Sequence, residues 1–313
     1  MRFGLLCTAS VDSAQSVIDY VNFNVEAEAL GFVSSFLVEH HFSGWNQVAA
    51  TLMLQTCVAT RTSSLRLGTG VMVLPWHNPV LVAEQAATLD VISGGRVDLG
   101  VGKGYRHSEF RGFNVDQREA DPRFEEALEV LVRAWTTRES FSHHGRYWTF
   151  DDIRVEPSPV QTPTPPIWIA AASETSIRRA AGWGHNLLLD QYASVGQIAE
   201  RIAWFGPGEV AVARQVYVAH SRAEADDALA RQAAFTRRTI DVSRAPHTAS
   251  GSHVLGYTNT EAHALFGTPD EIHQGLEELR LAGVGYVLVQ LASDVEQLRR
   301  FALEVAENAT LSA

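Results

Sequence analysis

The stretch FVSSFLVEHHF, residues 32–42, joins an apolar run to a carboxylate and two adjacent histidines. The run predicts a strand over residues 32–39, and polar groups at the outlet of a buried strand are costly unless something uses them. Neighbouring side chains on a strand face opposite sides, so His40 is expected to point inward, while Glu39 and His41 face the surrounding helices. Proteins that alternate strands and helices usually build their active sites at such strand ends.

Outward from this stretch, short apolar runs alternate with amphipathic helical runs along the chain. The expected strands cover residues 2–8, 32–39, 65–74, 96–102, 167–171, 185–189, 210–219 and 285–291. The expected helices cover residues 13–30, 46–60, 79–92, 121–137, 174–182, 195–205, 223–239, 269–282 and 295–309. Continuous apolar strands are typical of a parallel sheet buried on both faces. The simplest closure is an α/β (β/α)8 TIM barrel, and a doubly wound sheet with an appended domain is the alternative.

Two segments interrupt this alternation, and neither has the composition of a linker between domains. Residues 138–166 are rich in proline and have no helical period, so they predict a hairpin-like excursion followed by an extended strap. Residues 240–267 are polar and rich in glycine, serine and histidine. The sequence therefore predicts one barrel domain, residues 1–313, with insertions at these two places.

Charge and cysteine content narrow the class of protein. The net charge is −11 and no cluster of lysine or arginine interrupts it, which argues against a nucleic-acid partner. Cys7 and Cys57 lie in apolar segments, as reduced core thiols of a cytosolic protein do. The N-terminus is too short for a signal-peptide core, and no apolar run approaches about 18 residues. We expect a soluble, cytoplasmic protein with no membrane segment.

Two motifs follow expected strands and could hold a ligand. GVGKG, residues 100–104, lacks the spacing and the helical context of a dinucleotide-binding loop. It predicts either a glycine-lined floor for a flat ligand or a plain turn, and Lys103 could add a cation. The small and hydroxyl residues AAASETS, residues 170–176, precede an expected helix. They suit a phosphate, although an ordinary helix cap explains them as well.

Other reactive or charged residues give weaker evidence for a metal site or a nucleophile. His40 and His41 could bind zinc together with His77, but two histidines without an inward carboxylate make a weak zinc site, so no metal is predicted. A local signature for a nucleophilic cysteine is absent. The charged residues His107, Glu109 and Arg111 are expected to form a solvated patch.

Residues near the expected strand exits form the predicted substrate pocket. Trp45, Trp76 and Tyr105 could line an apolar pocket there or pack under loops, and Cys7 ends the first strand. These four residues are the candidates for contact with an organic substrate.

Several separated segments together resemble the bacterial-luciferase-like flavin-dependent monooxygenases. Their order and spacing match along nearly the whole chain. The segments are FGL at 3–5, VEHHF at 38–42, LGTGVMVLP at 67–75, GGRVDLGVG at 94–102, IWIAA at 167–171 and FGTPDE at 266–271.

The resemblance implies a barrel that binds reduced FMN, FMNH2, at its C-terminal mouth. The catalytic histidine of the family falls on His40, and its phosphate-binding positions fall on Ser173 and Ser176. The family's non-prolyl cis peptide beside the flavin ring falls on Thr69–Gly70.

Some positions depart from luciferase itself. Lys103 stands where luciferase has an arginine, Gly102 where it has a reactive cysteine, and Ala172 where it has a glutamate. These changes leave the expected FMN site intact and leave the substrate and light emission open.

The activity that the resemblance implies is a two-component monooxygenation. Reduced FMN from a separate NAD(P)H:flavin reductase would react with O2 to give a flavin peroxide that oxygenates a small organic substrate, while His40 manages a proton. Family members commonly form homodimers. A deazaflavin-dependent oxidoreductase and a non-catalytic flavin-binding relative are the alternatives.

Overall fold

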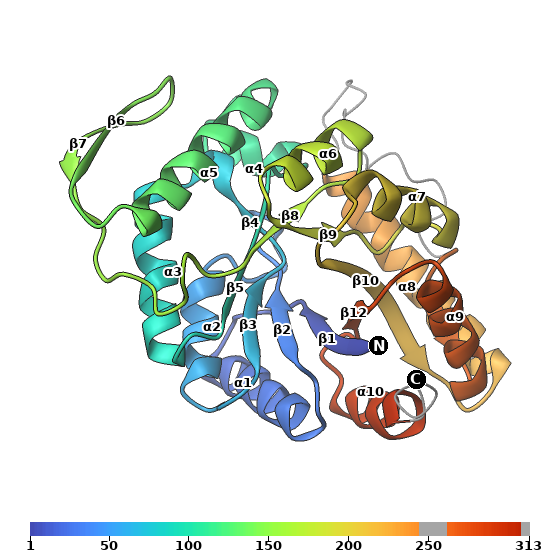
Figure 1. The fold of residues 1–313 in the computed structure, drawn as a ribbon. Helices are drawn as coiled ribbons and strands as arrows, with labels where there is room; N and C mark the ends of the chain where they lie inside the picture. Colours follow the sequence, from blue (N-terminus) through green and yellow to red (C-terminus); the bar gives the residue numbers. More distant parts are fainter. Residues whose placement is uncertain (244–261, 308–313) are drawn as a thin grey trace.

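The computed structural model describes residues 1–243 and 262–307, so most of the second predicted insertion, residues 240–267, lies outside the described residues. Within them, parallel strands close into an eight-stranded barrel ringed by helices (Figure 1). Neighbouring strands follow the order β1-β2-β3-β5-β8-β9-β10-β12, and β12 pairs with β1. The predicted α/β TIM barrel is confirmed.

All eight predicted strands are present. They are β1 (Arg2–Cys7), β2 (Ser34–Leu37), β3 (Arg66–Thr69), β5 (Val97–Gly102), β8 (Ile167–Ala170), β9 (Asn186–Leu189), β10 (Val210–Val218) and β12 (Tyr286–Gln290). A short β11 (Leu265–Gly267) pairs with the end of β10 outside the barrel order.

The strand predicted at residues 65–74 is broken into two. β3 ends at Thr69, and β4 (Met72–Val73) pairs with β5 alone. The non-prolyl cis peptide joins Gly70 to Val71, one residue after the expected Thr69–Gly70 bond. The expected position was wrong because the N–H of Gly70 still donates to Leu37 O at 2.8 Å, so the Thr69–Gly70 peptide belongs to the ladder between β2 and β3.

The helices on the outside of the barrel also follow the expected pattern. They are α1 (Ala14–Ala29), α2 (Thr51–Ala59), α3 (Pro79–Ser93), α5 (Ala120–Thr136), α6 (Glu174–Gly182), α7 (Val195–Phe205), α8 (Arg222–Ser243), α9 (Pro269–Leu281) and α10 (Val295–Arg300), which a π-helical turn (Phe301–Ala306) extends. Short 3-10 turns lie at Leu74–Trp76 (η1) and Gln117–Glu119 (η2). Their starts carry the usual caps, since Ser194 forms a capping box on α7 and Pro79 and Pro269 occupy first-turn positions.

Two helix predictions need correction. The helix expected from residue 46 begins only at Thr51, because residues 46–50 are irregular and form the bridge between Ser10 and Gln47. A short helix, α4 (His107–Gly112), occupies a stretch where no helix was expected and which includes the charged residues of the predicted solvated patch.

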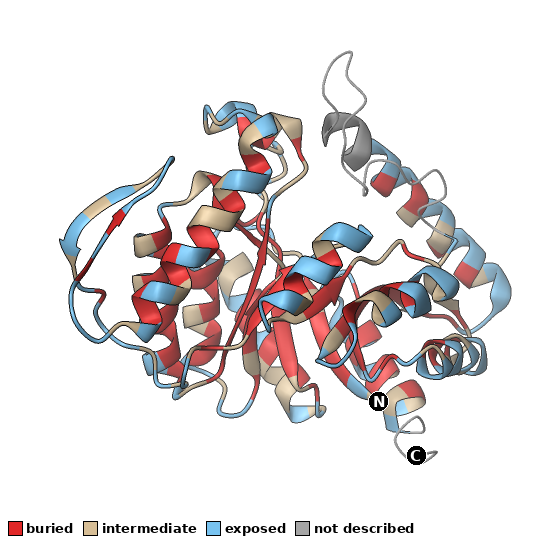
Figure 2. Ribbon diagram, turned by 45° about the horizontal axis from the view of Figure 1, so that its top comes forward, coloured by how far each residue is buried: buried red, intermediate tan, exposed pale blue. Residues whose placement is uncertain are grey.

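The barrel has an interior and an exterior apolar layer. Phe36, Trp168, Leu188, Tyr286 and Leu288 fill the inside of the sheet, and a larger cluster lies between the sheet and the helices. Figure 2 shows the buried strands at the centre and the helices with buried inner and exposed outer faces. Because side chains fill the barrel interior, a ligand cannot bind there, and a binding site is expected at the ends of the strands.

The first predicted insertion, residues 138–166, contains a two-stranded hairpin followed by an extended segment. β6 (Phe141–His144) and β7 (Thr149–Ile153) pair antiparallel and extend away from the barrel (Figure 1). The Glu126 carboxylate of α5 accepts the backbone N–H groups of Tyr147 and Trp148 at the hairpin turn. Among the described residues, no helix has both the length and the apolar content needed to cross a membrane.

Candidate active site

A cavity of about 1250 Å³ opens at the C-terminal ends of the strands. Its walls include residues that end or follow β1, β2, β5, β8 and β9 and residues within β10 and β12. Seven of the predicted site residues line it, namely His40, Gly70, Gly102, Lys103, Tyr105, Ser173 and Ser176. Thr69 does not, because it is buried in β3 and its hydroxyl donates to Gly100 O at 2.6 Å.

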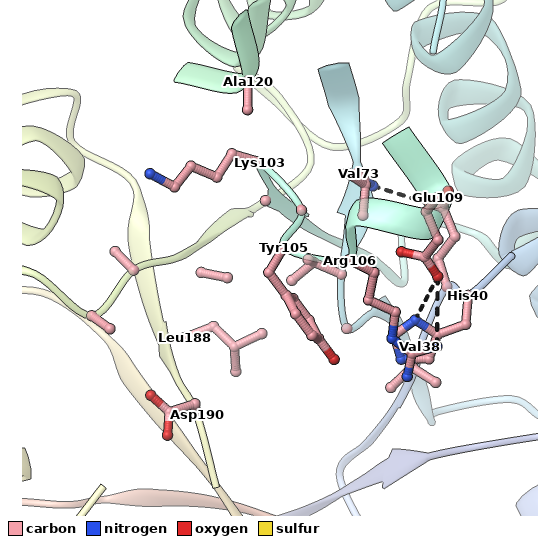
Figure 3. Close-up of a pocket in the computed structure, with 18 of the residues that line it drawn as sticks. Val38, His40, Val73, Lys103, Tyr105, Arg106, Glu109, Ala120, Leu188 and Asp190 are labelled. Atoms are coloured by element: carbon pink, nitrogen blue, oxygen red, sulfur yellow. Dashed lines mark hydrogen bonds and ion pairs between the residues drawn. The ribbon is translucent and has the colours of Figure 1, made fainter. Parts of the chain in front are cut away.

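His40 forms a buried pair with a carboxylate that the sequence did not single out. Its Nδ1 lies 3.1 Å from Glu109 Oε1, and the Glu109 side chain is only 2% exposed. Glu109 was expected in a solvated patch, which was wrong because α4 turns its side chain back under the barrel mouth, where it also accepts the His41 N–H at 2.9 Å. Figure 3 shows His40, Arg106 and Glu109 together on one side of the cavity.

The protonation of His40 follows from these neighbours. Burial lowers the pKa of His40, the hydrogen bond that its ring donates to Glu109 opposes that effect, and the positive charge of Arg106 lowers the pKa further. The imidazole is therefore neutral near pH 7. Because an ionised carboxylate only accepts, Nδ1 carries the proton and Nε2 is the basic nitrogen.

Glu39 and His41, the other polar residues at the end of the opening stretch, form a cluster with His77. Glu39 Oε1 lies 2.7 Å from His41 Nε2, 2.8 Å from His77 Nε2 and 3.0 Å from Trp76 Nε1, and its Oε2 accepts the Val73 N–H. Burial raises the pKa of Glu39, but the hydrogen bonds from the histidines outweigh it and the pKa falls to about 2.

The residue types and the spacing of this cluster also suit a metal ion. The ligand atoms of Glu39, His41 and His77 lie within 4.8 Å of one another. However, the carboxylate is already surrounded by four N–H donors, which accounts for its burial without an ion. His40 takes no part, so the zinc pairing of His40 with His41 considered from the sequence is not formed.

A pair of hydroxyl groups marks the β8 side of the cavity. Ser173 caps α6, its Oγ accepts the Ser176 N–H, and the two Oγ atoms are 2.8 Å apart. The side chain of Lys103 lies on the same cavity but is half exposed and pairs with Asp121 at 2.9 Å. Its charge is therefore shared with a carboxylate, which the sequence did not indicate.

Of the four predicted pocket residues, only Tyr105 lines the cavity. Cys7 lies on the outer face of β1, where burial raises its pKa to about 12. Trp76 packs against Phe113 with ring centroids 5.2 Å apart and donates to Glu39. Trp45 lines a smaller neighbouring pocket of about 210 Å³.

A polar wall was also missed. Gln215 of β10 and Gln290 of β12 point into the cavity and share a border with the smaller pocket, as do Thr8, Gln47 and Gln232. The available signal was a polar residue in the inward register of an otherwise apolar strand, because the same alternation that placed His40 applies to Gln215 and Gln290.

The family follows from comparison with known proteins. Residues 1–285 match the model of a family described as luciferase-like monooxygenases. The chain belongs to this family.

Relatives of this luciferase-like chain include named monooxygenases. The oxygenase component of the flavin-dependent trigonelline monooxygenase of Acinetobacter baylyi is 32% identical over 151 residues, which are 48% of this chain and 41% of that protein. The chain spans about half the length of the curated relatives that it matches.

Solved structures share the luciferase-like barrel over its full extent. The monooxygenase RslO1 from Streptomyces bottropensis superposes with a TM-score of 0.84 at 25% identity and covers 98% of this chain and 99% of its own. An F420-dependent secondary alcohol dehydrogenase superposes with a TM-score of 0.78 at 17% identity and covers 98% of this chain and 97% of its own. The second match concerns the fold alone.

Proposed function

We propose that this protein is the oxygenase component of a two-component flavin monooxygenase, which holds reduced FMN at the barrel mouth and uses O2 to oxygenate a small organic substrate. One observation carries the proposal. A single cavity is lined by the Ser173–Ser176 hydroxyl pair at the start of α6 and by the His40–Glu109 pair. The hydroxyl pair follows β8 and His40 follows β2, and β3 and β5 lie between these two strands.

The residues at the mouth fit a flat, phosphorylated ligand. Ser173 and Ser176 supply two hydroxyls at the N-terminus of α6, where free N–H groups and the helix dipole favour a phosphate. Gly102 lines the cavity without a side chain, and a Cβ at this position would lie only 2.6 Å from Val71 Cγ2. A cavity of about 1250 Å³ also leaves room for a substrate beside such a ligand.

Bound FMN would supply the activation of O2 that no side chain of the protein can perform. The contribution of the protein is to orient the ligand, exclude water and handle protons. His40, neutral and oriented through Nδ1 by Glu109, is suited to take up or deliver a proton at Nε2. Only 15% of the His40 side chain and 2% of the Glu109 side chain are exposed, which limits the access of water to the pair.

The reductase is proposed as a separate protein. The glycine motif at residues 100–104 follows β5 and leads into the short α4, so it does not form a nicotinamide-binding turn. A relative whose name is that of an oxygenase component supports the same division of labour.

The test compares cofactors directly. Purified protein is mixed anaerobically with reduced FMN or reduced deazaflavin, then exposed to 18O-labelled O2 and a panel of small organic compounds. We expect a product that carries one 18O atom with reduced FMN only. Product without O2 and with deazaflavin would instead identify a deazaflavin oxidoreductase. Tight flavin binding without any turnover would identify a non-catalytic flavin binder.

A further inference from the structure

Arg106 is a buried cation whose hydrogen-bonding capacity is largely unused. It lines the cavity immediately before α4 and its side chain is 6% exposed. Among residues 1–243 and 262–307, its guanidinium makes one hydrogen bond, from Nη1 to Gln47 Oε1 at 3.3 Å, and its Nε has no acceptor. A buried arginine has five donors to satisfy, so this one is poised for a further acceptor.

The same chain satisfies a buried arginine fully where no ligand is involved. Arg96, 9% exposed, donates from Nε to Ser93 O, from Nη1 to Thr62 Oγ1 and Leu65 O, and from Nη2 to Ala59 O and Thr62 O. The contrast indicates that the unused donors of Arg106 are specific to the cavity rather than a general feature of this fold.

Glu109 does not neutralise Arg106 by a close ion pair. Its Oε1 lies 3.7 Å from Arg106 Nη1, beyond hydrogen-bond distance, because the same oxygen already accepts from His40 Nδ1 and His41 N. Across the cavity, the Asp190 carboxylate is paired with Arg201 at 3.1 Å. Glu109 and Asp190 are thus committed to other partners, and Arg106 retains its attraction for an anion.

We infer that the substrate carries a carboxylate or a similar planar anionic oxygen group that binds Arg106 beside His40. This inference rests on the proposed function and names the substrate class of the same site. A guanidinium presents two parallel N–H groups that match the two oxygens of a carboxylate. The Tyr105 ring, 5.8 Å from the guanidinium and edge-on to His40, provides an aromatic wall for the organic part (Figure 3).

The test measures binding and needs no turnover. Protein saturated with oxidised FMN is titrated with benzoate and with benzamide, its uncharged analogue, by isothermal titration calorimetry. We expect benzoate to bind about tenfold more tightly or better, as one charge-assisted hydrogen bond predicts. In Arg106→Gln the two affinities should agree within about twofold.

The matched control is Arg118→Gln. Arg118 also lines the cavity, but it is 89% exposed and paired with Asp116, so its loss should leave the preference for benzoate unchanged. Arg106→Lys keeps the positive charge but lacks the two parallel N–H groups of the guanidinium, so it should retain part of the preference for benzoate over benzamide. Thermal melting of each variant confirms that the protein remains folded.

Three results would overturn the inference. Wild-type protein could bind benzoate and benzamide equally, Arg106→Gln could keep the preference, or Arg106→Gln could lose FMN while its relative affinity for the two probes stays the same. The last result would assign Arg106 to the cofactor. None of them depends on oxygenation, so a failure here is distinct from a failure of the proposed monooxygenase activity.

Discussion

His40 owes its expected reactivity to two neighbours of opposite charge. Glu109 holds the proton on Nδ1 through a hydrogen bond, and the positive charge of Arg106 disfavours a second proton on the ring. Nε2 is therefore the basic nitrogen of the imidazole. Replacement of His40 with Asn keeps a similar size and polarity but removes the titratable nitrogen. Product formation in His40→Asn should fall by about two to four orders of magnitude, while FMN affinity changes by no more than a few fold.

Steady-state product yield and fluorescence titration of FMN would measure these two effects. His107→Asn is the control, because His107 lines the same cavity and contacts Gln117 instead of the buried pair. Coupled turnover that survives in His40→Asn would remove His40 from the mechanism.

The pH profile tests the pair itself. Burial and Arg106 place the pKa of His40 below its usual value of 6.5, so activity that needs the neutral ring should fall only when the pH drops below that value. Glu109→Gln removes the negative charge that opposes this lowering. The acidic limb of the activity profile should therefore move to lower pH in the variant, and a shift to higher pH would contradict the assignment.

Among the elements, α6 carries the proposed phosphate site. Ser173 and Ser176 combine a helix cap with two hydroxyls that face the cavity. The double replacement Ser173→Ala with Ser176→Ala should weaken FMN binding about hundredfold or more, because each of the two lost hydrogen bonds to a charged group is worth about 1.5–3 kcal/mol. Riboflavin, which lacks the phosphate, should bind both proteins equally in a fluorescence titration.

Ser194→Ala separates ligand binding from helix stability. Ser194 caps α7 through a capping box but does not line the cavity. Loss of either cap should lower the free energy of unfolding by about 1 kcal/mol. Only the α6 variant should lose affinity for FMN while it keeps its affinity for riboflavin, and an equal effect of Ser194→Ala on FMN would refute a local phosphate site.

The elements also show where sequence reasoning succeeds. The strands were predictable because a parallel strand buried on both faces needs a continuous apolar run, and alternation placed His40 on the inside. The same alternation would have excluded Cys7, because Leu6 and Thr8 line the cavity and Cys7 faces the other way.

Other features depended on loop geometry that the sequence does not encode locally. Glu109 is charged and lies in no apolar run, so the sequence does not indicate that it is buried. Its burial follows from α4, a six-residue helix that is too short to be stable without tertiary contacts. Trp45 and Trp76 lie near strand ends as expected, yet their rings turn toward Phe235 and Phe113. The direction of a large side chain in a loop is set by packing partners distant in sequence.

At the scale of the molecule, association between copies stays a prediction. α2 and α3 pack together on one side of the barrel and expose Met53, Leu81 and Ile92, of which Met53 is 73% exposed. Apolar side chains on adjacent helices are suited to an interface. Light scattering should give twice the mass of the chain, and Leu81→Asp should give the monomer. A monomeric wild-type protein would contradict the expected homodimer.

The residues of the proposed site are divided between the two halves of the chain. His40, Arg106 and Glu109 precede the β6–β7 hairpin, whereas Ser173, Ser176 and the two inward glutamines follow it. A crossover within that protruding hairpin would disturb few barrel contacts. Recombination between relatives at this point would exchange the half with the proposed phosphate-binding serines as a unit. The half that contains His40, Arg106 and Glu109 would stay unchanged. The position of the hairpin thus offers a route by which such barrels diversify in nature and in the laboratory.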